Sequence, residues 1–277
     1  MQAFSVISNS ITQDIRLKGH QSIRFAPDGF SVLISDVSYT PVYLKHFAAE
    51  SPVPVEDLIA ECSRALDDEG LLSFEGETVL ISDSMAATLL PKQFVDVDKN
   101  REILEKICSL DKTDRVFDRS IKTRDFHLIY SVPEKIIGLG NRFAGDVKIL
   151  HASECLLSLS DQVKSSDHQR GVVMAEVQTH TLDLLVVAED RVLLLNRYWL
   201  NDPSDFIYHT LNTMRQLDLD RRTIPVYLSG VIHEEHEYIS LLAKYIRNVV
   251  HTPYYLEHLS REDILRFMIL SEGSKCV

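Results

Sequence analysis

The stretch SIRFAPDGFSVLI, residues 22–34, indicates how the fold begins. Two apolar runs flank the Pro-Asp-Gly tripeptide at 27–29, and such a tripeptide favours a tight turn because glycine accepts positive φ. The stretch therefore predicts a β-hairpin with strands at 22–26 and 30–34, followed by a third strand at 42–47.

Helical periodicity follows these strands. Apolar residues recur at three- and four-residue steps from Val55 to Leu66, after Pro54 and before Gly70, which is typical of an amphipathic helix with a clear start and end. Further elements are predicted along the first half: strands at 78–81, 126–132 and 147–150, and helices starting at 98, 134 and 152.

The same order of elements returns after a polar linker at 164–171. The second half is predicted to contain strands at 172–177, 182–188, 191–199, 223–228 and 249–250, and helices at 202–217, 239–246 and 260–272. In each half, 37 positions separate the hairpin turn from the last apolar residue of the first long helix, Gly29 to Leu66 and His180 to Leu217. The matching intervals predict an internal duplication.

The duplication defines the predicted domains. Residues 1–163 form the first half, with a small insertion around 112–132, and residues 164–277 form the second half. We expect the C-terminal helix at 260–272 to pack back on the first half. The predicted fold class is α/β, with two βββαβα halves and a cleft between them.

The charge balance limits the classes of partner. The chain has 41 acidic and 29 basic residues and a net charge of -12, so its surface repels phosphate backbones and anionic lipid. We expect no nucleic-acid binding and no membrane insertion, and other proteins or small molecules as partners.

The cysteine pattern indicates a reducing compartment. Cys62, Cys108, Cys155 and Cys276 are widely separated, and none belongs to a Cys-x-x-Cys pair. The N-terminal residues lack the basic and apolar regions of a signal peptide, and no apolar run approaches the length of a membrane span. These patterns predict a cytoplasmic protein.

The duplicated β-β-β-α-β-α pattern resembles the actin-like ATPase superfamily, whose members consist of two ribonuclease-H-like halves. The end of the first half, with residues 126–133, the glycines Gly138 and Gly140, and residues 147–150, is similar to the pilus-assembly and secretion-scaffold branch. More closely, the chain resembles a family of uncharacterised bacterial proteins with this fold. That resemblance implies the architecture and no particular activity.

The resemblance to actin-like ATPases implies a nucleotide clamp, in which each half offers a hairpin bearing an acid and a glycine. In the first half, Asp28 and Gly29 stand at the turn, but they are adjacent rather than spaced. In the second half, Glu176 is near the place of the acid, and Gln178 occupies the place of the glycine. The adenosine position carries Ser229 and a single glycine, Gly230.

These departures predict a degenerate cleft. A long side chain at Gln178 would project where a phosphate should approach, and the turn at Asp28 also suits an ordinary hairpin. We therefore expect no resident cofactor and no nucleotide hydrolysis, with a cleft that still binds ATP and magnesium as the alternative.

A second possible chemistry concerns His233 and His236, which flank two glutamates. Histidines three positions apart on a helix share a face and can hold one metal ion, although the spacing differs from that of the zinc-protease helix. The alternative is a helix start with acidic residues suited to the macrodipole and one partly buried histidine. We expect no metal site here.

A third feature is the segment 112–124, which is rich in basic residues within an acidic chain. It is typical of a solvated strand pair, with a docking site for an acidic partner as the alternative.

Taken together, the sequence predicts a non-catalytic actin-like-fold protein that acts by binding another protein. A nucleotide-regulated switch is the first alternative, and a metal-dependent hydrolase using His233 and His236 is the second. Self-association remains open, because nothing in the sequence identifies a self-complementary surface.

Overall fold

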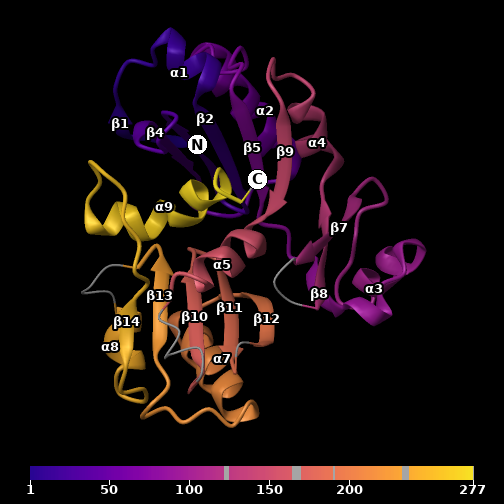
Figure 1. The fold of residues 1–277 in the computed structure, drawn as a ribbon, viewed down its shortest axis with the longest axis vertical. Coiled ribbons are helices and arrows are strands. Elements are labelled where there is room, and N and C mark those ends of the chain that lie inside the picture. Colours follow the sequence, from indigo (N-terminus) through magenta and orange to yellow (C-terminus); the bar gives the residue numbers. More distant parts are fainter. Residues whose placement is uncertain (122–124, 164–169, 190, 233–236, 277) are drawn as a thin grey trace. The chain divides into compact units, whose positions relative to one another are not determined.

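The computed structural model describes residues 1–121, 125–163, 170–189, 191–232 and 237–276. The chain divides into two compact units (Figure 1). Unit 1 contains Met1–Cys155, Leu256–His258 and Ile269–Val277, and unit 2 contains Leu156–Tyr255 and Leu259–Met268. The boundary between the units falls within two helices, α5 (Ala152–Ser160) and α9 (Arg261–Gly273), so each of these helices contributes residues to both units.

Unit 1 is built on a six-stranded mixed sheet of order β1-β4-β3-β2-β5-β9. In chain order, its strands are β1 (Gln2–Ser8), β2 (His20–Ala26), β3 (Gly29–Ser35), β4 (Pro41–Ala48), β5 (Glu77–Ser82) and β9 (Val147–His151). Its helices are α1 (Gln13–Lys18), α2 (Val55–Asp68) and α4 (Glu134–Gly140). Helix α2 contacts α4 and buries Leu58, Cys62 and Leu66, the i, i+4 and i+8 positions of one face.

A smaller three-stranded antiparallel sheet of order β6-β8-β7 is inserted in unit 1 after β5. It contains β6 (Ala87–Pro91), β7 (Arg115–Ile121) and β8 (Phe126–Val132), with the short helices η1 (Lys92–Phe94), η2 (Val97–Lys99) and α3 (Asn100–Glu105). The segment at 112–132 thus supplies two strands of this sheet, and its third strand comes from farther upstream.

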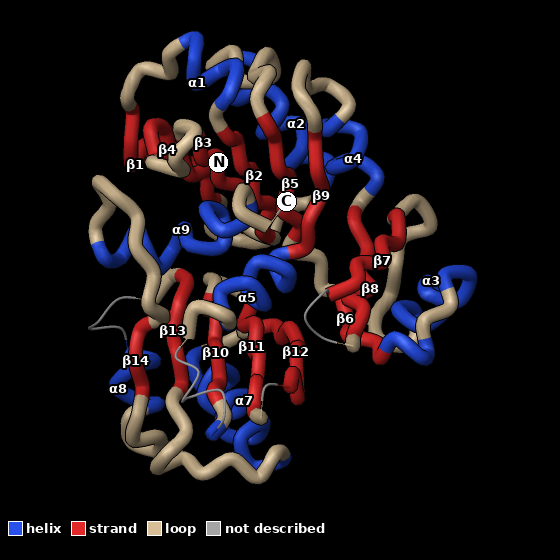
Figure 2. The backbone as a smooth tube through the Cα atoms, viewed as in Figure 1, coloured by secondary structure: helices blue, strands red, loops and turns tan. Residues whose placement is uncertain are grey.

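Unit 2 is built on a five-stranded sheet of order β12-β11-β10-β13-β14. Its elements are β10 (Val172–Val177), β11 (Thr181–Ala188), β12 (Arg191–Trp199), α7 (Pro203–Gln216), β13 (Val226–Gly230), α8 (Glu237–Leu242) and β14 (Val249–His251). Helices α7 and α8 cover one face of this sheet (Figure 2), and Phe206, Met214 and Leu242 pack there against apolar side chains of β10, β11 and β13.

The start of α7 follows from its sequence. The Asp202 side chain accepts a hydrogen bond of 2.7 Å from the backbone N–H of Ser204, and Pro203 occupies the first turn, where its missing N–H costs nothing. This cap therefore fixes where α7 begins, with three residues between it and the end of β12.

The two central sheets share one pattern. In unit 1, β2, β3 and β4 pair antiparallel in succession, β5 lies parallel to β2 on its other side, and β9 lies parallel to β5. In unit 2, β10, β11 and β12 pair antiparallel in the same way, β13 lies parallel to β10, and β14 lies parallel to β13. The predicted duplication is therefore present in the strand order, with β1 as an additional edge strand in unit 1.

Both hairpins turn over two residues. In unit 1, Ala26 pairs with Gly29, and in unit 2 the backbone N–H of Gln178 donates to the carbonyl of Thr181 at 2.8 Å. The third residue pair counted outward from the turn is Arg24 opposite Ser31 in unit 1 and Glu176 opposite Asp183 in unit 2. Arg24 and Glu176 therefore occupy equivalent positions in the two hairpins.

Three sequence expectations were wrong in detail. The helix expected from residue 98 is the short α3, which ends at Glu105 and leaves Ile107 53% exposed, because that part of the apolar stripe has no surface to pack on. The strand expected from 223 begins at Val226, because Asp220 closes a turn by accepting the backbone N–H groups of Arg222 and Ile224. The predicted helix at 239–246 ends at Leu242 in α8.

Strand β1 and helix α1 were not predicted. Most residues of β1 are exposed, so the strand lacks the alternation of apolar and polar residues that marks a half-buried strand. Among the described residues, no helix has both the length and the apolar character needed to cross a bilayer.

Candidate functional site

The hairpin turn of unit 1 carries Asp28 and Gly29. The carbonyl of Asp28 accepts a hydrogen bond of 2.7 Å from the N–H of Ala49, and its carboxylate has no hydrogen bond or ion pair with any described residue. A Cβ on Gly29 would lie 2.0 Å from the carbonyl oxygen of Phe47. The glycine therefore allows β3 and β4 to approach each other closely.

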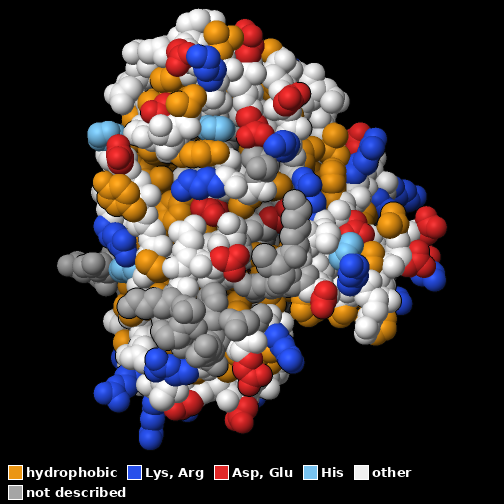
Figure 3. Space-filling view, viewed as in Figure 1, with side chains coloured by type: hydrophobic (Ala, Val, Ile, Leu, Met, Phe, Trp, Pro, Cys, Tyr) orange, Lys and Arg blue, Asp and Glu red, His pale blue; other side chains and the backbone are white. Residues whose placement is uncertain are grey.

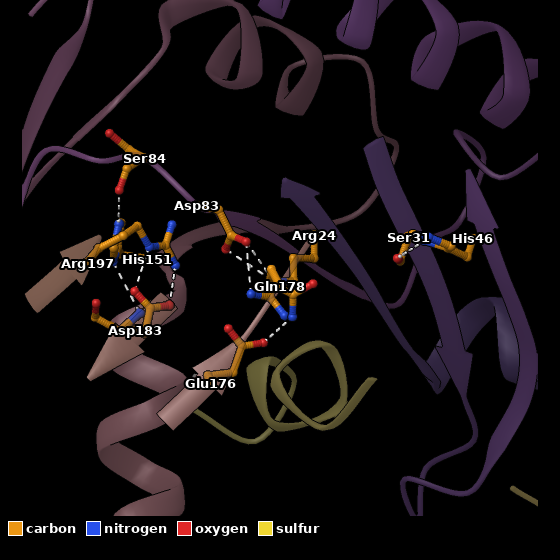
Figure 4. Close-up of polar contacts among 11 residues, drawn as sticks. Arg24, Ser31, His46, Asp83, Ser84, His151, Glu176, Gln178, Asp183 and Arg197 are labelled. Atoms are coloured by element: carbon orange, nitrogen blue, oxygen red, sulfur yellow. Dashed lines mark hydrogen bonds and ion pairs between the residues drawn. The ribbon is translucent and has the colours of Figure 1, made fainter. Parts of the chain in front are cut away.

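A polar row crosses the unit 1 sheet just inside this hairpin. Arg24 on β2 pairs in register with Ser31 on β3, which pairs with His46 on β4. The Ser31 hydroxyl lies 2.9 Å from Nδ1 of His46 (Figure 4). The three side chains thus share one face of the sheet.

Arg24 forms a buried ion pair with Asp83, the residue that follows β5. Its Nε lies 3.1 and 3.0 Å from the two carboxylate oxygens, and an Nη lies 2.8 Å from Oδ2 (Figure 4). The side chains of Arg24 and Asp83 are 6% and 1% exposed. Both oxygens of Asp83 are thus held by one guanidinium, in the bidentate geometry that arginine favours.

The corresponding row in unit 2 contains Glu176, Asp183 and Arg197, one residue from each of β10, β11 and β12. It lies on the sheet face opposite to the α7 and α8 core, because the core side chains of β10 are Val173, Ala175 and Val177. All three residues of the row are buried.

Asp183 and Arg197 form a buried, doubly hydrogen-bonded ion pair in unit 2. Nε of Arg197 lies 2.6 Å from Oδ1 of Asp183, and Nη2 lies 2.5 Å from Oδ2 (Figure 4). Their side chains are 4% and 3% exposed, so water screens the attraction very little. Glu176, next in the row, accepts a hydrogen bond from the side-chain amide of Gln178.

Ser229 and Gly230 end β13 beside this row. Ser229 pairs in register with Glu176 and is buried. Gly230 has φ of +95°, and a Cβ there would lie 1.9 Å from the carbonyl oxygen of Val177. The N–H of Val231 donates to that same carbonyl at 2.7 Å, so the bare glycine backbone is needed to end the parallel strand pair.

His151, at the end of β9 in unit 1, has a defined tautomer. Its Nδ1 accepts the backbone N–H of Ser153 at 3.1 Å, so Nε2 carries the proton and donates to the carbonyl of Ser84 at 2.8 Å (Figure 4). The side chain fixes the loop after β5. Nearby, burial raises the pKa of the Glu154 carboxyl, which also accepts the backbone N–H of His151.

The weak metal candidates His233 and His236 lie outside the described residues. Within the part of the chain that the structure describes, no group of three or more His, Cys, Asp or Glu side chains is arranged to hold a metal ion.

The structure thus places the six predicted cleft residues in two separate sets. Asp28 and Gly29 lie at the unit 1 hairpin, and Glu176, Gln178, Ser229 and Gly230 lie together at the ends of β10 and β13 in unit 2. Sequence reasoning missed the four ions that dominate these regions: Arg24, Asp83, Asp183 and Arg197. The sequence did contain a signal for such ions: a charged residue within an apolar strand, such as Asp183 between two leucines. Because a buried charge requires a partner, such a residue predicts a buried ion pair.

Comparison with known structures identifies the fold. A crystal structure from Bacteroides thetaiotaomicron, described as a protein with actin-like ATPase fold and unknown function, matches with a TM-score of 0.73 and 17% identity over 87% of this chain and 94% of that one. The PilM-PilN type IV pilus biogenesis complex matches with a TM-score of 0.59 and 10% identity, covering 92% and 97% of the two chains. The ethanolamine utilization protein EutJ from Carboxydothermus hydrogenoformans matches with a TM-score of 0.50 and 9% identity, covering 94% and 89%.

These matches confirm the predicted fold class, an α/β actin-like ATPase fold with two mixed sheets. They also confirm the predicted resemblance to the pilus-assembly branch. No curated protein sequence matches the chain. A family model described as protein of unknown function (DUF3822) matches residues 9–249, and the chain therefore belongs to the DUF3822 family.

Proposed function

We propose that this chain is a non-catalytic protein of the cytoplasm that keeps the actin-like architecture and acts by binding another protein. The observation that carries the proposal is the pairing of two buried aspartates with buried arginines. Asp83 is paired with Arg24 in unit 1, and Asp183 is paired with Arg197 in unit 2.

This pairing opposes a hydrolytic magnesium site. Mg²⁺ needs oxygen ligands in near-octahedral geometry at about 2.0–2.1 Å and is bound through one or two carboxylates in phosphoryl-transfer enzymes. A guanidinium nitrogen already lies 2.5–3.1 Å from each of the four oxygens of Asp83 and Asp183. A metal ion would have to displace an arginine side chain that is itself buried, which would leave its guanidinium without a partner.

The glycines give independent support. The resemblance to actin-like ATPases assigns Gly29 and Gly230 to close approach by a phosphate or nucleoside. In this chain both glycines face a strand carbonyl, that of Phe47 or Val177, at distances that exclude any Cβ. Strand packing alone therefore accounts for these glycines.

A protein partner is supported by the likeness to the PilM-PilN complex, in which a protein of this fold assembles with a second protein. With nucleotide hydrolysis lost, as we propose, a surface of the fold can still bind another protein, because one fold hosts many functions.

Thermal unfolding with and without millimolar ATP and Mg²⁺ tests the proposal. A ligand that binds the native state alone stabilises it by about 2.7 kcal/mol at a hundred times its Kd. We expect no shift in Tm and no phosphate release, and we expect a chromosomally tagged copy to retain one partner in constant ratio with or without ATP. A shift that is lost in Asp28→Ala would overturn the proposal.

One observation favours a nucleotide-regulated switch as a second candidate. The Asp28 carboxylate lies half-buried at a hairpin tip and makes no bond to any described residue, so it is available to a ligand or to hydrated metal. For the switch, the Tm shift with ATP and Mg²⁺ would depend on Asp28, and the partner would be released or captured with nucleotide.

A further inference from the structure

Unit 2 carries a group of positive charges at the end of its sheet where β13 and β14 begin, whereas Glu176 lies near the carboxyl end of β10. The basic patch consists of five exposed cations from the end of α7 and from the loops that precede β13 and β14: Arg215, Arg221, Arg222, Lys244 and Arg247. Figure 3 shows Lys and Arg side chains projecting from this end of unit 2. The patch stands out because the whole chain has a net charge of -12.

The backbone holds these segments together. The N–H of Arg247 donates to the carbonyl of Arg221 at 3.0 Å, and the side-chain amide of Asn248 donates to the carbonyls of Arg222 and Thr223 at 3.4 and 3.3 Å. The five cations therefore belong to one surface whose backbone is ordered.

The charges of the basic patch are not neutralised internally. None of the five cations forms an ion pair with another described residue; Arg215 donates only to the neutral side chain of Asn212, at 3.0 Å. Two carboxylates lie among them, Asp218 and Asp220, and Asp220 is engaged in closing its own turn. An excess of cations remains.

The basic segment noticed in the sequence behaves differently. Arg115 pairs with Glu134 at 3.0 Å, and Arg119 pairs with Glu154 at 3.7 Å, while residues 122–124 lie outside the described part. The two described arginines of this segment are thus paired, whereas the five cations of the basic patch, which come from three separate segments, are not.

Next to the basic patch is an open pocket of about 430 Å³. Half of its lining residues are polar or charged. Tyr208, Leu211, Met214 and Leu219 provide the larger apolar or aromatic surface, and the rest of the lining consists of two cations of the patch, one carboxylate and one amide: Arg215, Arg221, Asp218 and Asn212. Tyr208 is 62% exposed, so a large aromatic surface remains uncovered. Apolar pockets with a few charged groups are typical of anchoring sites, where an aromatic or aliphatic side chain is buried and charges set the orientation.

We propose that the pocket and the basic patch form a docking site for an acidic segment of a partner protein, which inserts one apolar side chain beside Tyr208 and places Asp or Glu side chains on the five cations. The inference rests on the proposed protein-binding function and specifies its chemistry. Charge complementarity identifies the occupant: five unpaired cations outnumber the two carboxylates among them and attract further carboxylates, and the concave, partly apolar pocket suits a side chain better than a flat lipid surface.

The test uses the full chain and a phage-displayed library of random short peptides. We expect enrichment of peptides with an aromatic or aliphatic residue flanked by Asp and Glu. The affinity of an enriched peptide is then measured by fluorescence anisotropy at low and high salt, and we expect it to fall several-fold as salt screens the exposed charges.

Three variants separate the site from general charge effects. The triple reversal Arg215→Glu, Arg221→Glu and Arg222→Glu should weaken binding by about tenfold or more. Tyr208→Ala should weaken it by about tenfold through the lost anchor. The matched control reverses three exposed lysines of unit 1, Lys92→Glu, Lys106→Glu and Lys112→Glu, and should leave the affinity unchanged.

The other outcomes overturn the inference. These are equal weakening by the patch and control reversals, absence of acidic peptides from the selection, and stronger binding of anionic vesicles than of peptides. A concentration-dependent dimer lost in the patch reversal would replace the partner by a second copy of this chain. Each of these results leaves the proposed function standing, because that function is tested separately by nucleotide binding and by partner retention.

Discussion

The Asp183–Arg197 pair provides the most direct test of the structure. Its two hydrogen bonds of 2.6 and 2.5 Å join side chains that are almost completely buried, on adjacent antiparallel strands in direct register. Opposite charges about 4 Å apart attract by about 4 kcal/mol at an effective dielectric constant of about 20. Removing one partner leaves the other ion buried and unpaired.

We therefore expect Arg197→Leu and Asp183→Leu each to lower the free energy of unfolding by about 3–5 kcal/mol. The double variant should lose less than either single variant, because an apolar pair of similar volume no longer buries an isolated charge. The assay is urea unfolding followed by circular dichroism, with the double-mutant cycle giving the coupling between the two residues.

The matched control is the Asp14–Lys18 pair of α1, whose side chains are 68% and 66% exposed. Lys18→Leu should leave the unfolding midpoint within error, since exposed pairs contribute little. The reasoning would be refuted if each single variant lowered the free energy of unfolding by less than about 1 kcal/mol and the double variant lost the sum of the two. Such a result would show that Asp183 and Arg197 are solvated.

Further predictions concern backbone, pH and thiols. Gly230→Ala should destabilise unit 2 by more than about 2 kcal/mol in urea unfolding, since φ is +95° and the Cβ would collide with the Val177 carbonyl, whereas Gly138→Ala, whose Cβ meets no atom within 4 Å in helix α4, should stabilise by about 0.5–1 kcal/mol. Burial raises the folded-state pKa of Glu154 above its ordinary value of 4.5, so near that pH the native state binds more protons at this site than the unfolded state does. The free energy of unfolding, relative to that of Glu154→Gln, should therefore fall as the pH rises from about 4.5. A difference between the two proteins that does not depend on pH would contradict this. Burial raises the pKa of both the Cys62 and the Cys108 thiol, so accessibility separates them. The buried Cys62 should react with a thiol reagent only on unfolding, whereas the partly exposed Cys108 should react in the native state, and mass spectrometry of the labelled peptides distinguishes the two.

Local patterns were sufficient to predict much of the fold. The Pro-Asp-Gly turn, the apolar stripe of α2 and the cap at Asp202 each encode one element within a few residues, and the interval between hairpin and helix exposed the duplication. Strand β1 escaped prediction because its exposed side chains carry no periodic signal. The short α3 was overestimated because periodicity continued beyond the surface available to bury it.

The candidate site was less predictable because its main contacts are long-range. Arg24 and Asp83 are 59 positions apart, and only the parallel pairing of β2 with β5 brings them together. The basic patch is scattered over three segments, so no window of sequence contains it. By contrast, Gln178 and Glu176 are two positions apart in the sequence, and their side chains form a hydrogen bond at the hairpin.

The equivalent positions Arg24 and Glu176 carry opposite charges, and each half has adjusted to its own. Arg24 relies on Asp83, whose counterpart in unit 2, counted along the parallel strand, is the apolar Val231. A chimaera that received the β10–β11 hairpin in place of β2–β3 would confront Asp83 with a second buried acid, and the reciprocal graft would leave an arginine facing valine. The two hairpins share one strand pattern but are therefore not interchangeable, and a substitution tolerated in one half gives no guide to the equivalent position of the other.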